Sequence, residues 1–306
     1  MLTKQIWGTT MTRKLAGMHA ALMTGLSDDG AFSPDRQRAL DEYVLRQGLT
    51  GLYVGGSSGE SGLLDTEELL AQQEVVAQDA KGVTLIAHVG APSLRDSIRL
   101  AKNASKLGYH GLSALPPHSY PFSDAEILGY YRDLQAATDL PLIVYEVPVR
   151  TGRPIALEIL TEILALPNVA GLKFTSNDMF KLSMLRRACP DSTLFFGFDE
   201  IYLSGAVLGA DGGIGTTYNL LGKLYVALDQ AIRIGNMAEA QRLQDISARF
   251  VEALLGTGVL PGMKAAFRAI GINPGPTRAP MVMRAADGEA RMAALMACPE
   301  FAEWLA

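Results

Sequence analysis

Cysteine is scarce in this chain: its 306 residues include two, Cys189 and Cys298, which form no C-x-x-C pair. Neither a disulfide framework nor a cysteine-based zinc site is predicted, and a reducing compartment is indicated. Long hydrophobic runs are also absent, since no stretch reaches the roughly 18 uninterrupted apolar residues that a membrane span needs. Residues 1–14 have no long apolar core and no small-residue cleavage pattern, so they do not resemble a signal peptide. We expect a cytoplasmic protein.

Basic residues are also fewer than acidic ones, with 27 Lys and Arg against 32 Asp and Glu. The formal net charge is -5 and no cluster of Lys and Arg occurs, which argues against a nucleic-acid-binding face. The four histidines lack i, i+4 spacing and there is no G-x-S-x-G motif, so neither a metal site nor a Ser-His-Asp hydrolase is predicted. What remains is an ordinary globular composition, with 48% hydrophobic and 19% charged residues, which is too apolar for a disordered chain.

Short β-type runs alternate with longer segments of helical spacing along most of the chain. The eight runs lie at residues 18–22, 51–54, 83–88, 111–115, 142–145, 170–173, 193–196 and 212–215. The helical segments between them lie at residues 33–47, 66–80, 93–107, 123–137, 156–166, 178–188 and 200–208. This alternation predicts an α/β fold with parallel strands, and eight strands predict a (β/α)8 TIM barrel. An open doubly wound sheet is the alternative, but it usually has fewer strands and would make the glycine-rich turn a nucleotide site.

Beyond about Asn219 the β signal stops. Residues 220–234, 237–255 and 261–270 have helical spacing, so we expect a C-terminal helical extension of the barrel. The predicted organisation is an N-terminal extension at residues 1–16, a catalytic barrel at residues 17–232 and a C-terminal helical region at residues 233–306.

Lys173 occupies an unfavourable position for an ammonium group, in an apolar run that is typical of a short buried strand. Desolvation disfavours the charged form of lysine, so a buried amine shifts towards the neutral nucleophile that attacks ketones. The alternative is a lysine whose stem is buried while its charge reaches water. Catalytic residues of barrels lie at the carboxyl ends of the strands, and Lys173 ends the sixth run.

The same topology brings further polar residues to this end of the barrel. The turn at residues 55–59 offers backbone N–H groups and two hydroxyls, Ser57 and Ser58, which suit a carboxylate unless they merely cap a helix. Tyr145 ends the fifth run and either relays protons or packs in the core. Arg150 follows it and would clamp a carboxylate or remain solvated.

A carboxylate pair, Asp199 and Glu200, follows the seventh run just after Gly197. Adjacent carboxylates bind sugar hydroxyls, but the same position also suits the N-cap of a helix. Both interpretations stay open on the residues alone.

Five motifs in register are similar to those of a known family. They are residues 51–60 (Gly-Leu-Tyr-Val-Gly-Gly-Ser-Ser-Gly-Glu), Tyr145 with Pro148, residues 172–175 (Leu-Lys-Phe-Thr), residues 197–200 (Gly-Phe-Asp-Glu) and residues 209–219 (Gly-Ala-Asp-Gly-Gly-Ile-Gly-Thr-Thr-Tyr-Asn). The chain resembles the N-acetylneuraminate lyase and dihydrodipicolinate synthase family of class I, pyruvate-binding aldolases, from about Gly17 into the helical tail. The resemblance implies a barrel with C-terminal helices and a homotetramer built as a dimer of dimers. It also implies chemistry through a covalent imine, without a metal or other cofactor.

The resemblance assigns roles to individual residues. Lys173 corresponds to the Schiff-base lysine and Tyr145 to the tyrosine that relays protons and orients the substrate. Ser57 and Ser58 correspond to the hydroxyl pair that holds the pyruvate carboxylate, with Thr175 beside the lysine. The remaining residues expected to bind substrate are Gly197, Asp199, Glu200, Thr216 and Arg150.

The family has two well-known branches, and the chain shares features with both. The segments 55–60, 199–200 and 209–215 resemble the lyase branch, in which the acidic pair contacts the polyol of the sugar acid. Arg150 matches instead the position of the arginine that the synthase branch uses for the carboxylate of aspartate semialdehyde. Four positions depart from the family pattern and suggest a changed pocket: Ser119 and Glu146, where tyrosine and asparagine are common, and Thr216 and Phe198, where the lyase has serine and often tyrosine.

We therefore predict a metal-independent, pyruvate-dependent aldolase, most like N-acetylneuraminate lyase, that acts on a 4-hydroxy-2-oxo acid and uses a small aldehyde or sugar-acid substrate. The first alternative is dihydrodipicolinate synthase, which condenses pyruvate with aspartate semialdehyde, or another 2-oxo acid aldolase or dehydratase. An alternative of another class is a catalytically silent ligand-binding barrel, which the serine at position 119 supports.

Overall fold

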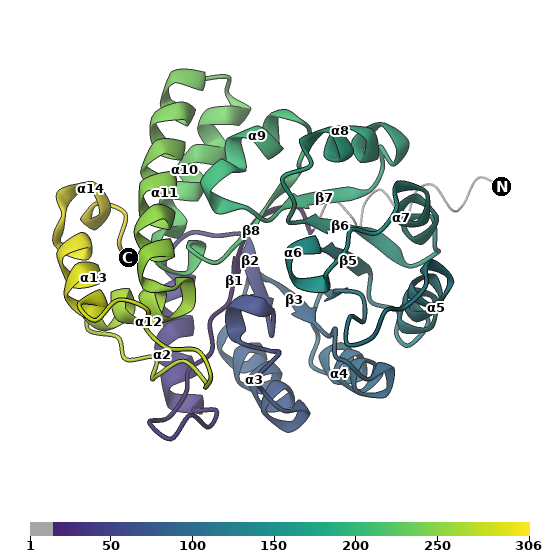
Figure 1. The fold of residues 1–306 in the computed structure, drawn as a ribbon, viewed down its shortest axis with the longest axis horizontal. Helices are drawn as coiled ribbons and strands as arrows, with labels where there is room; N and C mark the ends of the chain where they lie inside the picture. The colour runs from purple at the N-terminus through teal and green to yellow at the C-terminus, as the bar shows by residue number, and fades with distance from the viewer. Residues whose placement is uncertain (1–14) are drawn as a thin grey trace.

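The computed structural model describes residues 15–306, in which eight parallel strands close into a barrel (Figure 1). The strands are β1 (Gly17–Ala21), β2 (Gly51–Val54), β3 (Thr84–His88), β4 (Gly111–Ala114), β5 (Leu142–Glu146), β6 (Val169–Phe174), β7 (Thr193–Phe196) and β8 (Gly212–Gly215). Each strand pairs with the next one along the chain, and β8 pairs with β1 to complete the ring. The predicted barrel and its strand count are confirmed.

Helices surround the strands (Figure 1). They are α2 (Pro34–Leu45), α3 (Thr66–Asp79), α4 (Leu94–Lys106), α5 (Asp124–Gln135), α7 (Leu157–Leu164), α8 (Met179–Ala188) and α9 (Tyr202–Val207). Side chains cap the starts of several of them: Asp65 and Ser123 form capping boxes with Glu68 and Glu126. Such caps satisfy backbone N–H groups that a helix leaves free, which explains why these helices begin where the sequence predicted.

Three short elements follow the carboxyl ends of strands, and the first two lie outside the helical segments that the sequence predicted. They are η1 (Ser57–Gly59) after β2, α6 (Pro148–Thr151) after β5 and η2 (Asp199–Ile201) after β7. Each holds about one turn, which is too short for a hydrophobic period to reveal. All three carry residues of the predicted site.

Two apolar layers flank the strands. The larger fills the space between strands and helices. The smaller lies inside the barrel and consists of Leu15, Ala21, Tyr53, Ile86, Ile143, Ala170, Phe195 and Ile214. Because successive residues of a strand face opposite sides, Ile143 and Tyr145 of β5 both point inward. Tyr145 lies opposite Lys173 of β6, so strand alternation alone brings both into the barrel.

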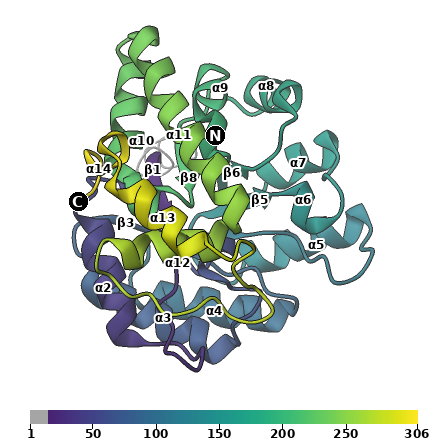
Figure 2. The same ribbon diagram turned by 60° about the vertical axis from the view of Figure 1, so that its left-hand side comes forward.

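The C-terminal helices are α10 (Tyr218–Arg233), α11 (Met237–Thr257), α12 (Val259–Ala269), α13 (Gly288–Ala297) and α14 (Pro299–Ala302). The predicted helical extension is therefore present, and it lies beside the first helix of the barrel (Figure 2). Tyr43 of α2 and Phe267 of α12 pack edge to face with 5.4 Å between ring centroids. Segments from opposite ends of the chain thus share one core.

Other predictions about organisation are not tested by the fold. Residues 1–14, most of the proposed N-terminal extension, lie outside the described residues, and the boundary between residues 232 and 233 stays a prediction. Within residues 15–306, no single helix is long and apolar enough to cross a membrane, although α11 and α12 meet that criterion together as a pair bent by 109°. The cytoplasmic location stays a prediction.

Candidate active site

Lys173 lies inside the barrel at the carboxyl end of β6, with 4% of its surface exposed. Its Nζ is 4.3 Å from the ring centroid of Tyr53 and 4.2 Å from that of Tyr145. Burial lowers the pKa of Lys173, and this effect outweighs the neighbouring Tyr145 and Asp199, which act in the opposite direction. The lysine therefore does not carry its charge to water, and more of it is in the neutral form that attacks a carbonyl.

Tyr145 is equally buried, with 4% of its surface exposed. Burial raises the pKa of its phenol, but Lys173, Arg150 and the hydroxyls of Thr175 and Ser57 together outweigh burial, so that the pKa is lowered. A phenol with a lowered pKa exchanges protons more readily near neutral pH. The structure thus brings together the predicted lysine and tyrosine in a geometry suited to acid–base chemistry on a bound ketone.

The hydroxyl turn, residues 55–59, follows β2 at the same end of the barrel. Gly55 has a φ of 72°, and a Cβ at Gly56 would lie 2.6 Å from the Tyr53 ring, so both positions require glycine. Ser58 Oγ is 2.7 Å from Thr216 Oγ1, which connects this turn to the end of β8. Neither serine caps the short helix that they begin. Their hydroxyls instead face the site, where Ser58 contacts Thr216 and Ser57 contacts Tyr145.

Asp199 is buried, and its Oδ2 accepts hydrogen bonds from the backbone N and the hydroxyl of Thr217, at 2.8 and 2.7 Å. Burial raises the pKa of Asp199 to about 6, although the bonds from Thr217 oppose the shift. Its other oxygen, Oδ1, would be 2.2 Å from a Cβ on Gly215. The carboxylate therefore holds the turn after β8 and does not cap its own helix, while Glu200 beside it is half-buried.

Glycine at position 197 leaves room beside the lysine. A Cβ there would lie 1.9 Å from Thr175 Oγ1 and 3.4 Å from Lys173 Cε. Gly197 and Thr175 therefore lie next to the lysine, which the resemblance implied for Thr175. Any larger residue at position 197 would displace Thr175 and the lysine.

Arg150 lies apart from this buried group, on α6, where it is exposed. Among residues 15–306, its guanidinium forms no hydrogen bond or ion pair. It is still near enough to influence the pKa of both Tyr145 and Lys173. Its place at the outer side of the site suits contact with the far end of a substrate.

The expectation that Glu146 changes the pocket is wrong. Glu146 is the residue after Tyr145, so strand alternation directs it outward, where its Oε1 pairs with Lys181 Nζ at 2.9 Å. Lys181 also donates to the carbonyl of Ile155 at 2.6 Å, and the backbone N of Ile155 donates to Glu146. The carboxylate thus makes a structural contact that joins β5 to α8 and to the segment before α7.

Two other departures are placed as follows. Phe198 is half-buried and packs against Phe196, with 6.3 Å between ring centroids. Ser119 is exposed, and the neighbouring Tyr120 has 74% of its surface exposed.

Sequence reasoning missed two rings beside the lysine. Tyr53 of β2 donates its hydroxyl to Ser113 at 2.9 Å and places its ring beneath Lys173 Nζ. His88 of β3 is buried against both tyrosines, and burial, assisted by Lys173, lowers its pKa to about 3. The alternation of inward-facing residues along β2 and β3 was the signal that could have found these two rings.

Among the described residues, no group of three or more His, Cys, Asp or Glu is arranged to hold a metal ion.

A buried amine beside a phenol at the carboxyl end of a (β/α)8 barrel is the arrangement of a carbon–carbon lyase of the class I aldolase type. The comparison with known proteins makes this specific: residues 14–297 match the dihydrodipicolinate synthetase family, and the chain belongs to it. Within the family it is a pyruvate-dependent class I aldolase most like N-acetylneuraminate lyase.

Three relatives illustrate the similarity. The N-acetylneuraminate lyase of Rhizobium meliloti (strain 1021) is 44% identical over 268 residues, which cover 87% of this chain and 89% of that one. The N-acetylneuraminate lyase of Fusobacterium nucleatum in complex with pyruvate has a TM-score of 0.88 and 32% identity, over 96% of this chain and 98% of that one. A catalytic lysine mutant of the Ruminococcus gnavus sialic acid aldolase has a TM-score of 0.91 and 29% identity, over 95% and 98% of the two chains.

Proposed function

We propose that this aldolase cleaves a 4-hydroxy-2-oxo acid into pyruvate and an aldehyde through an imine on Lys173. The observation that carries the proposal is the buried amine of Lys173, whose pKa is lowered by burial and whose Nζ lies 4.2 Å from the ring centroid of Tyr145. Support also comes from the Ruminococcus gnavus aldolase, which is described as having a catalytic lysine.

The reaction begins when the Lys173 amine attacks the ketone at C2, and loss of water gives an iminium. As the C3–C4 bond breaks, its electron pair moves into the iminium and forms an enamine, while Tyr145 takes the proton of the 4-hydroxyl and the aldehyde leaves. Tyr145 then returns this proton to C3 of the enamine, which gives the imine of pyruvate and restores the base. Water hydrolyses the resulting imine, which releases pyruvate and restores the amine.

Positioning falls to the residues around this pair. The hydroxyl turn, with Ser57 and Ser58, would hold the 2-oxo carboxylate and so align the reacting carbons. Thr175 and Gly197 line the space beside the lysine. The Fusobacterium nucleatum relative was solved with pyruvate, which supports a pyruvate-sized site in this barrel.

The far end of the substrate would meet Asp199, Glu200, Thr216 and Arg150. An acidic pair favours the polyol of a sugar acid, as in an N-acetylneuraminate lyase. Arg150 favours a second candidate, condensation of pyruvate with aspartate semialdehyde, because its exposed guanidinium lacks a partner among residues 15–306 and would pair with a second carboxylate. We infer the homotetrameric assembly from the family alone.

Trapping with borohydride tests the imine. Reduction in the presence of pyruvate should add one pyruvate-derived mass to Lys173, read by peptide mass spectrometry. Lys181 and Lys264 serve as internal controls, because both are buried but paired with carboxylates, and they should stay unmodified. An unmodified Lys173 would overturn the mechanism.

Turnover separates the remaining candidates. Pyruvate formation or consumption is followed with N-acetylmannosamine and with aspartate semialdehyde as partners. A preference for the first supports the lyase assignment and a preference for the second supports the synthase. Imine formation without turnover of any aldehyde would favour a silent ligand-binding barrel.

A further inference from the structure

Behind the hydroxyl turn lies a strained residue with a buried charge. Among residues 15–306, Glu60 is the one non-glycine residue with a positive φ, 61°. A left-handed conformation costs a non-glycine residue roughly 1–2 kcal/mol, so surrounding contacts must hold it. Such strain is concentrated where a fold maintains a functional geometry.

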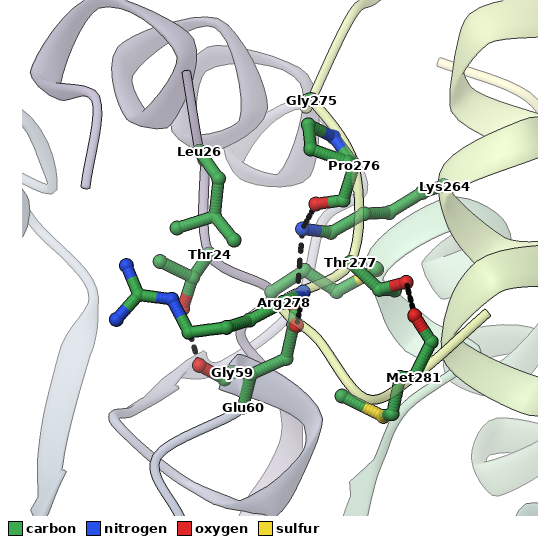
Figure 3. A network of polar contacts seen from close by, with 12 residues as sticks. Thr24, Leu26, Gly59, Glu60, Lys264, Gly275, Pro276, Thr277, Arg278 and Met281 are labelled. Carbon is green, nitrogen blue, oxygen red and sulfur yellow. Dashed lines mark hydrogen bonds and ion pairs between the residues drawn. The ribbon is translucent and has the colours of Figure 1, made fainter. Parts of the chain in front are cut away.

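The contacts that hold Glu60 come from the C-terminal helical region (Figure 3). Glu60 Oε1 pairs with Lys264 Nζ of α12 at 2.7 Å, and the two side chains are 0% and 1% exposed. Lys264 also donates to the carbonyl of Pro276 at 2.6 Å, while the backbone N of Arg278 donates to Glu60 Oε2 at 2.7 Å. Lys264 of α12 and the backbone of Arg278, 218 residues from Glu60 in the sequence, therefore meet at one carboxylate.

A buried ion pair is a poor way to gain stability. Replacing such a pair with apolar residues is often neutral or stabilising, whereas removing one partner leaves a costly unpaired charge. In some proteins such a pair is retained because it fixes a unique arrangement of the segments that it joins. Glu60 directly follows the hydroxyl turn, so this turn is a segment whose arrangement the pair would fix.

Glu60 is bonded directly into the hydroxyl turn. Its backbone N donates to the carbonyl of Ser57 at 3.2 Å, and the N of Gly59 donates to the carbonyl of Gly56 at 3.0 Å. From the opposite side, Thr24 Oγ1 donates to the carbonyl of Gly59 at 2.6 Å. A change in the backbone of Glu60 would therefore move Ser57 and Ser58.

We propose that Glu60 and Lys264 are positioning residues, and that their ion pair lets the C-terminal helices hold the hydroxyl turn in the conformation that binds the 2-oxo carboxylate. The inference rests on the proposed role of that turn. It assigns to the helical extension a part in substrate affinity, in addition to its packing against α2.

The test removes both charges at once. In Glu60→Gln/Lys264→Met no buried charge is left unpaired, so the protein should fold with an unfolding midpoint close to that of the unaltered chain. The dissociation constant for pyruvate, measured by calorimetry, should rise about tenfold or more, and KM for the oxo acid should rise with it, because a small misplacement of a positioning group is costly. The kcat should fall much less, since Lys173 and Tyr145 are untouched.

Glu68→Gln is the matched control. Glu68 accepts two bonds from the Arg278 guanidinium, at 2.6 Å each, and lies in the same network without contacting the backbone of residues 56–60. It should leave the pyruvate dissociation constant within about twofold. Lys264→Arg, which keeps the charge, should restore part of the affinity that Lys264→Met loses.

Two outcomes would overturn the proposal: an unchanged pyruvate dissociation constant in the folded double variant, or an equal rise in the Glu68→Gln control. Failure of the proposed function gives a different result, since the unaltered protein would then bind pyruvate without forming a reducible adduct at Lys173. The calorimetric comparison judges the positioning role in that case as well.

Discussion

The two halves of the candidate site differ in how firmly the protein holds them. The inner half, Lys173 and Tyr145 with the Tyr53 and His88 rings, is buried and lies on paired strands. The outer half, on the segments that follow β4 and β5, includes Arg150 and Ser119, which are exposed. Rigid strands suit bond-making groups, and loops suit recognition that varies among relatives. Reaction type and substrate choice should therefore respond to different substitutions.

Removal of the Lys173 amine should have the largest effect and should affect the reaction itself. Lys173→Ala should lower kcat by roughly 10⁴-fold or more, because no neighbouring group replaces a covalent nucleophile. Turnover of the oxo acid and borohydride trapping should be lost together, while the melting temperature stays near that of the unaltered protein or rises, since a buried amine is removed. Lys102→Ala, at an exposed position, is the control. Turnover within tenfold of normal would show that Lys173 is not the nucleophile.

Substitution of Tyr145 tests the inner half while leaving Lys173 able to form the imine. Tyr145→Phe should lower kcat by about 10²- to 10³-fold, the range expected for loss of a general acid–base group. Pyruvate should still be trapped on Lys173, although more slowly. Tyr130→Phe is a matched control, because Tyr130 is a buried tyrosine whose hydroxyl contacts Ser97 instead of the site. If trapping and turnover fall by the same factor, Tyr145 acts on imine formation and not on cleavage.

Substitutions in the outer half should change which aldehyde is preferred without changing the type of reaction. Arg150→Ala should lower kcat/KM about tenfold to a hundredfold for an aldehyde that bears a carboxylate, since hydrogen bonds to charged groups contribute about 1.5–3 kcal/mol. Aldehydes without a carboxylate and pyruvate trapping should change little. Arg153→Ala controls for loss of an exposed arginine in the same segment, because Arg153 pairs with Asp124. Equal losses with both kinds of aldehyde would contradict a role in recognition.

Sequence reasoning predicted the inner half better than the outer one, for a physical reason. Alternation along a strand and the position of active sites in barrels depend on local pattern, so Lys173, Tyr145 and the hydroxyl turn could be named in advance. Contacts between distant segments have no local signal. Neither the bond from Thr217 to Asp199 nor the Glu60–Lys264 pair could be read from spacing, and the direction of Glu146 was missed although alternation implied it.

Asp199 lies between the two halves of the site, and its substitution should have the smallest of the effects predicted. Its pKa is about 6 in the folded protein, above the ordinary value of 3.8, so folding favours its protonated form. The ionised carboxylate therefore destabilises the fold above pH 6, and this cost is relieved as the pH falls towards 4.

Asp199→Asn removes this titration while keeping an oxygen for the backbone N of Thr217. Between pH 7 and pH 5, the free energy of unfolding of the unaltered protein should rise relative to the variant by about 1 kcal/mol, as measured by urea denaturation. Asp41, whose pKa burial raises to about 7, titrates in both proteins and cancels in the difference. A difference that stays constant or falls with acidification would place Asp199 in a solvated environment, and so in the outer half of the site.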